Sequence, residues 1–188
     1  MTVGFAICGS FCTFHRIPAE LERLKSAGYR ILPIFSQIAY STDTRFGVAR
    51  EFVETVETIC GEKSIYTISG AEPIGPKKLL DALIIAPCTG NTLAKLACGI
   101  TDSSVTMAAK AHLRNERPLI LAVSTNDGLG LNAKNIGTLS ATRHIYFVPY
   151  GQDDPVSKTK SLVSDMTLIL PTLESALSGK QLQPTLLR

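Results

Sequence analysis

Residues 81–99 limit most strongly what this chain can fold into. They open with a short apolar run, Leu-Ile-Ile-Ala at 83–86, which is typical of a buried strand in a parallel sheet. We expect Pro87 to end this strand. A helix should follow it, capped by one of three residues: Thr89, Asn91 or Thr92. A strand, a tight loop and a helix in this order place free backbone N–H groups where α/β proteins bind phosphates and planar cofactors. The same residues also fit a turn with a good helix cap and no ligand.

Strands and helices alternate along the rest of the chain. The alternation predicts an α/β fold, a single-domain doubly wound (Rossmann-like) parallel sheet with helices on both faces. We expect one domain over residues 1–188, with a core at about 3–150 and a C-terminal helical segment at about 156–180. Further strands are predicted at residues 3–8, 30–35, 64–68, 119–123 and 145–148.

Small polar residues follow several of the predicted strands. Gly9-Ser10, with Thr13, follows the first strand, and Ser36 follows the second. A glycine-rich loop at 124–130 follows the strand at 119–123. Because parallel strands end at one edge of a sheet, these loops predict a site for a phosphate-bearing planar ligand. Helix capping explains Ser10 and Thr13 equally well.

Charge and composition argue against several classes of function. The net charge is only +3, and there is no run of five Lys or Arg, so nucleic acid binding is not indicated. Apolar runs of about six residues are far shorter than the roughly 18 that span a bilayer. The five cysteines form no Cys-x-x-Cys pair and the three histidines lie far apart, so we expect no metal site. With no signal peptide pattern, the expectation is a cytoplasmic protein with no membrane segment.

Residues 86–95, Ala-Pro-Cys-Thr-Gly-Asn-Thr-Leu-Ala-Lys, resemble a known signature. It is the Ala-Pro-Ala-Thr-Ala-Asn-Thr-x-x-Lys segment of the flavoprotein superfamily that includes the homo-oligomeric flavin-containing cysteine decarboxylases. The resemblance covers residues 3–150 and implies a flavin site. Its other matches are Gly9-Ser10 in the first phosphate-binding loop, Ser36 and Ala39 in a Thr/Ser-x-x-Ala segment, and Asn126 in a Pro-x-Met-Asn strand.

Four longer stretches, 41–47, 71–77, 124–132 and 149–155, are similar to one branch of that superfamily, the B subunits of dipicolinate synthase. This resemblance implies a flavin-binding subunit, with FMN as the cofactor, that acts with the A subunit of dipicolinate synthase. Together they would oxidise dihydrodipicolinate, a small dicarboxylate on the lysine branch, to dipicolinate during sporulation. It also implies NADP on the A subunit rather than on this chain, a trimer-based homo-oligomer, and the cytoplasm of the mother cell.

The decarboxylase reaction fits this chain poorly. Decarboxylases of the superfamily place a catalytic histidine eight residues before the aspartate that opens the flavin strand. Counting back from Asp81 gives Pro73, with Glu72 beside it, and neither can act as an imidazole base. Their later loop also carries a cysteine, whereas no cysteine follows Cys98 here. A decarboxylase would have to use an unrelated base.

The resemblance assigns expected roles to individual residues. Substrate carboxylates would bind Arg45 and Asn126, although Arg45 also fits a solvated helix end. No residue is an obvious general base, and the candidates for a catalytic role are Asn126, Asp127, Glu72 and Asp153. The cofactor would contact Gly9, Ser10 and Thr13 at its phosphate, and Ser36, Ala86, Pro87, Cys88, Thr89, Gly90, Asn91 and Thr92 at its ring system. The alternative is a non-catalytic partner that builds the oligomer and completes the active site of the A subunit.

Overall fold

Parallel strands form the centre of the sheet in the computed structural model, which describes residues 1–187. The order β2-β1-β3-β4 joins β1 (Thr2–Ile7), β2 (Arg30–Phe35), β3 (Ala82–Cys88) and β4 (Leu119–Thr125). The first half of β4 also pairs in parallel with β5 (Ile145–Phe147). The predicted strands at 3–8, 30–35, 83–86, 119–123 and 145–148 are therefore confirmed within two residues at each end.

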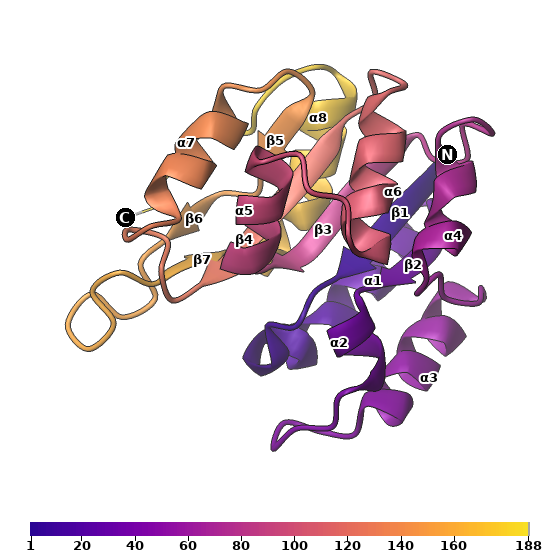
Figure 1. Ribbon diagram of the computed structural model, residues 1–188, viewed down its shortest axis with the longest axis horizontal. Coiled ribbons are helices and arrows are strands. Elements are labelled where there is room, and N and C mark those ends of the chain that lie inside the picture. Colours follow the sequence, from indigo (N-terminus) through magenta and orange to yellow (C-terminus); the bar gives the residue numbers. More distant parts are fainter. Residues whose placement is uncertain (188) are drawn as a thin grey trace.

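Helices cover both faces of this sheet, as the alternation predicted (Figure 1). On one face pack α1 (Ile17–Ser26), α3 (Ala49–Cys60) and α8 (Ile169–Leu177). On the other pack α4 (Ile68–Ala71), α5 (Gly90–Ala97), α6 (Ser104–Leu113) and α7 (Ala133–Ser140). Short elements complete the fold: α2 (Gln37–Ser41) and the 3₁₀ turns η1 (Phe11–Arg16), η2 (Glu72–Ile74) and η3 (Met166–Leu168).

The side chains of β3 show why the sheet needs two helical layers. Leu83 and Ile85 point into one apolar cluster, whereas Ile84 and Ala86 point into the other. Successive residues of a strand face opposite sides, so a strand that is apolar throughout must be covered twice. All seven residues of β3 are buried. The fold class predicted from the sequence, a Rossmann-like α/β sheet with helices on both faces, is thus confirmed. Strand β3 lies inside this sheet, between β1 and β4.

Two details of the expected strands are wrong. Pro87 does not end β3, because the strand continues to Cys88 after a register shift between Ile85 and Cys88. That irregularity lets a residue without an N–H group lie inside a strand. The segment 64–68 is not a strand and keeps only one bridge, from Ile65 to Ile34. Its next residues turn instead, because the Thr67 side chain accepts a hydrogen bond from Gly70 N and caps α4.

The sheet also has an antiparallel part that the sequence pattern did not predict. It consists of β6 (Tyr150–Gly151) and β7 (Leu162–Ser164), and β7 pairs with the end of β4. The C-terminal helical segment expected at about 156–180 is therefore wrong in its first half, and α8 begins only at Ile169. The Ser164 hydroxyl donates to Val148 O at 3.0 Å, and Asp165 then caps η3. Met166, Ile169 and Leu173 lie in the core, which thus extends beyond residue 150.

Because His112 is buried, we expect the protein to lose stability as the pH falls. Its ring is fully buried, Nε2 lies 3.0 Å from Pro118 O, and Nδ1 has no partner within residues 1–187. Burial lowers the pKa of His112 from 6.5 to about 4. The unfolded chain therefore takes up this proton first as the pH falls. We expect the free energy of unfolding to drop by about 3 kcal/mol between about pH 6.5 and pH 4 on this account.

Urea unfolding of the wild type and of His112→Gln across that pH range measures this effect. The glutamine can still donate to Pro118 O but does not titrate. The variant should lose about 3 kcal/mol less than the wild type as the pH falls. Parallel pH profiles for the two proteins would contradict the assignment.

Candidate functional site

A cleft of about 840 Å³ opens at the carboxyl edge of the parallel strands. The loops after β1, β3 and β4 form its walls, together with residues 45–46 and the loop between β6 and β7, which projects at the lower left of Figure 1. This volume is within the usual range for ligand sites. Eight of the predicted site residues line it: Gly9, Ser10, Arg45, Thr89, Gly90, Asn91, Asn126 and Asp127. Asp153, the further candidate base, lines it as well.

A cluster of hydroxyl groups joins two of these loops. Ser124 Oγ lies 2.8 Å from Ser10 Oγ and 3.0 Å from Thr13 Oγ1. Ser10 lines the cleft, whereas Thr13 is buried and faces Ser124. The backbone N–H groups of Ser10 and Thr13 donate to Cys8 O and Ser10 O, so both are used within the loop. An anion at this end of the cleft would therefore meet the Ser10 hydroxyl rather than these two N–H groups.

The amino end of α5 forms the wall beside this cluster. Of the three predicted caps, Thr89 is the one observed: it accepts from Thr92 N at 3.3 Å. Gly90 and Asn91, the first helical residues, line the cleft. N–H groups in the first turn of a helix have no partner within the helix, and the helix dipole favours negative charge there. This helix end is thus suited to an anionic or electron-rich part of a ligand.

Gly90 allows two other loops to approach α5 closely. A Cβ atom at this position would lie 2.5 Å from Asn132 Nδ2 and 2.6 Å from Thr125 Oγ1. Both side chains line the cleft, so a larger residue at 90 would have to displace them. The shape of the cleft at this point depends on the glycine.

The remaining predicted residues lie outside the cleft lining. Ala86, Pro87 and Cys88 are buried in β3, and the Thr92 hydroxyl donates to Cys8 Sγ at 3.2 Å. These residues lie in the core directly before and after the Thr89–Asn91 turn that lines the cleft. Ser36 instead caps α2, accepting from Ala39 N at 3.3 Å. Glu72 is exposed on η2 and does not line the cleft, so the site does not bring it together with Asn126 and Asp127.

The acid–base groups near the cleft fall into two classes. Burial raises the pKa of the Cys8 thiol to about 11 and that of Cys88 well above its usual range, so both stay protonated at neutral pH. The Ser161 hydroxyl, helped by Lys158 at 3.2 Å, lowers the pKa of Asp153. A carboxylate with a lowered pKa is a weak base. Asp127 accepts from Leu131 N at 3.3 Å and Asn132 Nδ2 at 3.4 Å, both in its own loop.

Several lining residues were missed from the sequence. Ser124 was one of many polar residues in its loop, and only the position directly after a buried strand distinguished it. Lys158 and Ser161 were missed because their segment was expected to become helical. Asn132 and Thr125 become part of the site through their contact with Gly90, which no local pattern reveals.

A family model for flavoproteins matches residues 1–168. The B subunit of dipicolinate synthase from Bacillus subtilis (strain 168) is 47% identical over 184 residues, covering 98% of this chain and 92% of that protein. The chain belongs to the flavoprotein family, in the branch formed by the B subunits of dipicolinate synthase. The crystal structure of the B subunit from Bacillus halodurans C agrees: it is 45% identical, with a TM-score of 0.92 over 100% of this chain and 96% of that one.

More distant flavoproteins share the fold alone. The FMN-dependent cysteine decarboxylase SpaF is 21% identical, with a TM-score of 0.63 over 94% of this chain and 97% of that one. Within residues 1–187 of this flavoprotein, no helix is long and apolar enough to cross a bilayer. In the same residues, no three His, Cys, Asp or Glu side chains gather as they would around a metal ion.

Proposed function

We propose that this chain is the FMN-binding B subunit of dipicolinate synthase. With the A subunit, which would carry NADP, it oxidises dihydrodipicolinate to dipicolinate during sporulation. The observation that carries the proposal is the cleft, because Thr89, Gly90 and Asn91, from the segment that resembles the flavoprotein signature, form one of its walls. The near full-length similarity to the B subunits of dipicolinate synthase supports the choice of substrate.

The residues present fit a flavin nucleotide. The cleft offers about 840 Å³, hydroxyl groups at Ser10 and Ser124, and the amino end of α5 at Gly90 and Asn91. Ser10 would bind the phosphate, and the 89–91 turn would lie against the ring system. When bound, the flavin supplies a hydride acceptor.

The chain's own side chains would position the substrate. The guanidinium of Arg45 is planar and can bind a carboxylate with two hydrogen bonds, and Asn126 can donate to a second carboxylate or a carbonyl. Aromatisation of the dihydropyridine also requires loss of a proton. Asp127 lines the cleft and is the candidate acceptor. The lowered pKa of Asp153 makes that carboxylate a weak base.

The proposed setting follows the same resemblance. The protein would work in the cytoplasm of the mother cell as a trimer-based homo-oligomer bound to the A subunit.

A second candidate function is a non-catalytic partner that completes the active site of the A subunit. Two observations favour that alternative. Glu72 does not line the cleft, and the carboxylates of Asp127 and Asp153 already interact with neighbouring groups of this chain. Few acid–base groups are therefore free for catalysis.

Reconstitution with the purified A subunit tests the proposed function. Dipicolinate formation from dihydrodipicolinate should require the FMN-loaded chain, and the flavin-free chain should give less than about a tenth of that rate. Equal rates with and without FMN would support the non-catalytic partner. No dipicolinate in either case would refute the assignment of the reaction.

Cysteine labelling offers an independent measure of cofactor position. Cys12 and Cys98 are the exposed thiols among the five cysteines, and only Cys12 lines the cleft. We expect saturating FMN to slow alkylation of Cys12 by iodoacetamide at least about tenfold, because the ligand covers the thiol. Labelling of Cys98, at the far end of α5, should not change. Mass spectrometry of digested protein quantifies both sites, and equal protection of both would contradict binding in the cleft.

A further inference from the structure

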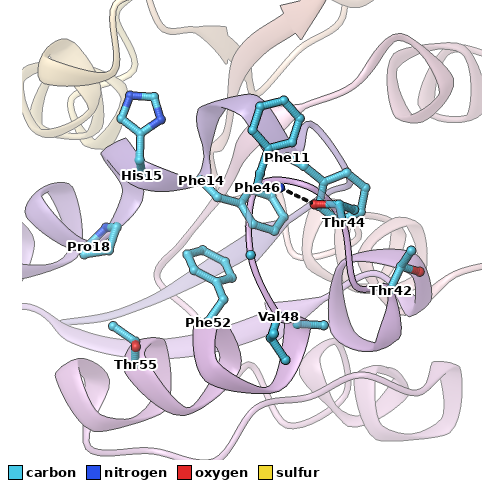
Figure 2. Close-up of a pocket in the computed structure, with 12 residues that line it drawn as sticks. Phe11, Phe14, His15, Pro18, Thr42, Thr44, Phe46, Val48, Phe52 and Thr55 are labelled. Atoms are coloured by element: carbon cyan, nitrogen blue, oxygen red, sulfur yellow. Dashed lines mark hydrogen bonds between the residues drawn. The ribbon is translucent and has the colours of Figure 1, made fainter.

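A second, smaller cavity of about 250 Å³ lies beside the cleft, between η1, the start of α1 and the start of α3 (Figure 2). Four of the seven phenylalanines of the chain line it: Phe11, Phe14, Phe46 and Phe52. Phe11 and Phe46 also line the cleft, so the two cavities share a wall. This apolar cavity is therefore contiguous with the edge of the cleft.

The rings in this aromatic pocket pack on one another but remain open to solvent. Phe14 stacks on Phe52 with centroids 4.3 Å apart, and Phe11 lies tilted 5.1 Å from Phe14. Phe46 is 54% exposed and Val48, at the rim, is 43% exposed. Large apolar side chains gathered on one surface typically mark a ligand groove or an interface.

The charges around the aromatic pocket indicate the kind of occupant. Arg16 lies between two lining residues along the chain, and the Arg45 guanidinium lies 4.9 Å from the Phe46 ring centroid. None of the ion pairs within residues 1–187 includes either arginine. Asp43, close by in sequence, instead accepts from Ala49 N at 2.8 Å. The surroundings thus carry positive charge that an acidic partner can neutralise.

Composition and size favour a protein over a small molecule. Interface cores are enriched in aromatic residues and arginine and depleted in lysine and glutamate, and no lysine or glutamate lines this pocket. Its volume is also below the usual range for a complete small ligand, but it suits one apolar side chain that anchors a partner.

We propose that the aromatic pocket is the docking site for the A subunit, whose contact segment carries one apolar anchor side chain flanked by carboxylates. This inference rests on the proposed function, since it requires the partner to work at the neighbouring cleft. Because the two cavities share Phe11 and Phe46, a partner docked here would border the flavin cleft. This chain itself carries a net charge of +3, so an acidic A subunit fits the positive surroundings of the pocket better than a second copy does.

The test measures the affinity of the A subunit for the FMN-loaded chain by titration calorimetry. Val48→Asp introduces a carboxylate at the pocket rim while supplying a favourable cap for α3, whose Val48 side chain makes no cap hydrogen bond. We expect this variant to bind the A subunit more weakly, by at least about tenfold. Arg16→Glu should also weaken binding and should reduce its dependence on salt. The matched control is Ile100→Asp, a similarly exposed apolar residue, 47% exposed, outside both cavities.

Each outcome decides a different question. Weaker binding by Val48→Asp with unchanged FMN uptake, and wild-type binding by Ile100→Asp, support the docking site. Equal binding by the wild type and all three variants overturns it and leaves the proposed function intact. Loss of FMN uptake or of the homo-oligomer in Val48→Asp overturns it in favour of a cofactor subsite or a contact between copies. If the wild type binds FMN but not the A subunit, the docking site and the two-subunit proposal both fail.

Discussion

Replacement of Asn91 by tryptophan should abolish FMN binding without unfolding the protein. Asn91 is exposed in the first turn of α5 and lines the cleft, so a bulky ring there occupies the space expected for the cofactor. We expect the affinity for FMN to fall at least about a hundredfold, which corresponds to about 2.7 kcal/mol. The effect on folding should be small, because tryptophan differs from asparagine by only a few tenths of a kcal/mol in helix propensity.

Lys110→Trp is the matched control. Lys110 is also exposed on a helix, α6, but does not line the cleft. Fluorescence titration with FMN should give the wild-type dissociation constant for this variant and no saturable binding for Asn91→Trp. Wild-type binding by Asn91→Trp would mean that the flavin binds outside this cleft.

The largest effect on stability is expected from Phe5→Ala. Phe5 lies in the middle of β1, is fully buried, and packs in the cluster between the sheet and the helices α1, α3 and α8. Truncation removes the transfer free energy of the ring and leaves a cavity, which together cost about 3–5 kcal/mol. A loss of this size is a large part of the stability of an ordinary domain, which is about 5–15 kcal/mol.

Phe46→Ala provides the comparison within the same residue type. Phe46 is 54% exposed on a loop, so its truncation should change the free energy of unfolding by less than about 1 kcal/mol. Urea unfolding of the flavin-free proteins, followed by circular dichroism, measures both values. Similar losses for the two variants would show that the core cluster is not the main source of stability.

Much of the fold could be predicted because its strands can be recognised from short stretches of sequence. The runs around Ile84 and Ile120 are apolar on both faces, and a strand of this kind requires helices on two sides. Thr89 was predicted as one of three caps, since a cap depends on residues close in sequence. The alternation of strands and helices predicts a parallel sheet, whose strands end at one carboxyl edge. The loops that form the cleft could therefore be predicted to meet at that edge.

The parts that were missed depend on contacts between distant residues. Gly151 and Val163 pair across a polar loop, in strands too short to show an apolar pattern. The bond between Ser10 and Ser124 joins residues 114 positions apart. Pro87 remains within β3 because a register shift accommodates it, which a local rule for proline does not anticipate.

An absorbance scan of the purified protein, before and after addition of FMN and removal of unbound flavin, tests the flavin cleft most directly. We expect bound flavin in the wild type, with its visible bands retained after gel filtration, and none in Asn91→Trp. A wild-type protein that stays colourless and takes up no FMN would contradict the flavin cleft. Residues 86–95 would then serve only the fold, and a non-catalytic partner of the A subunit would become the better description of this chain.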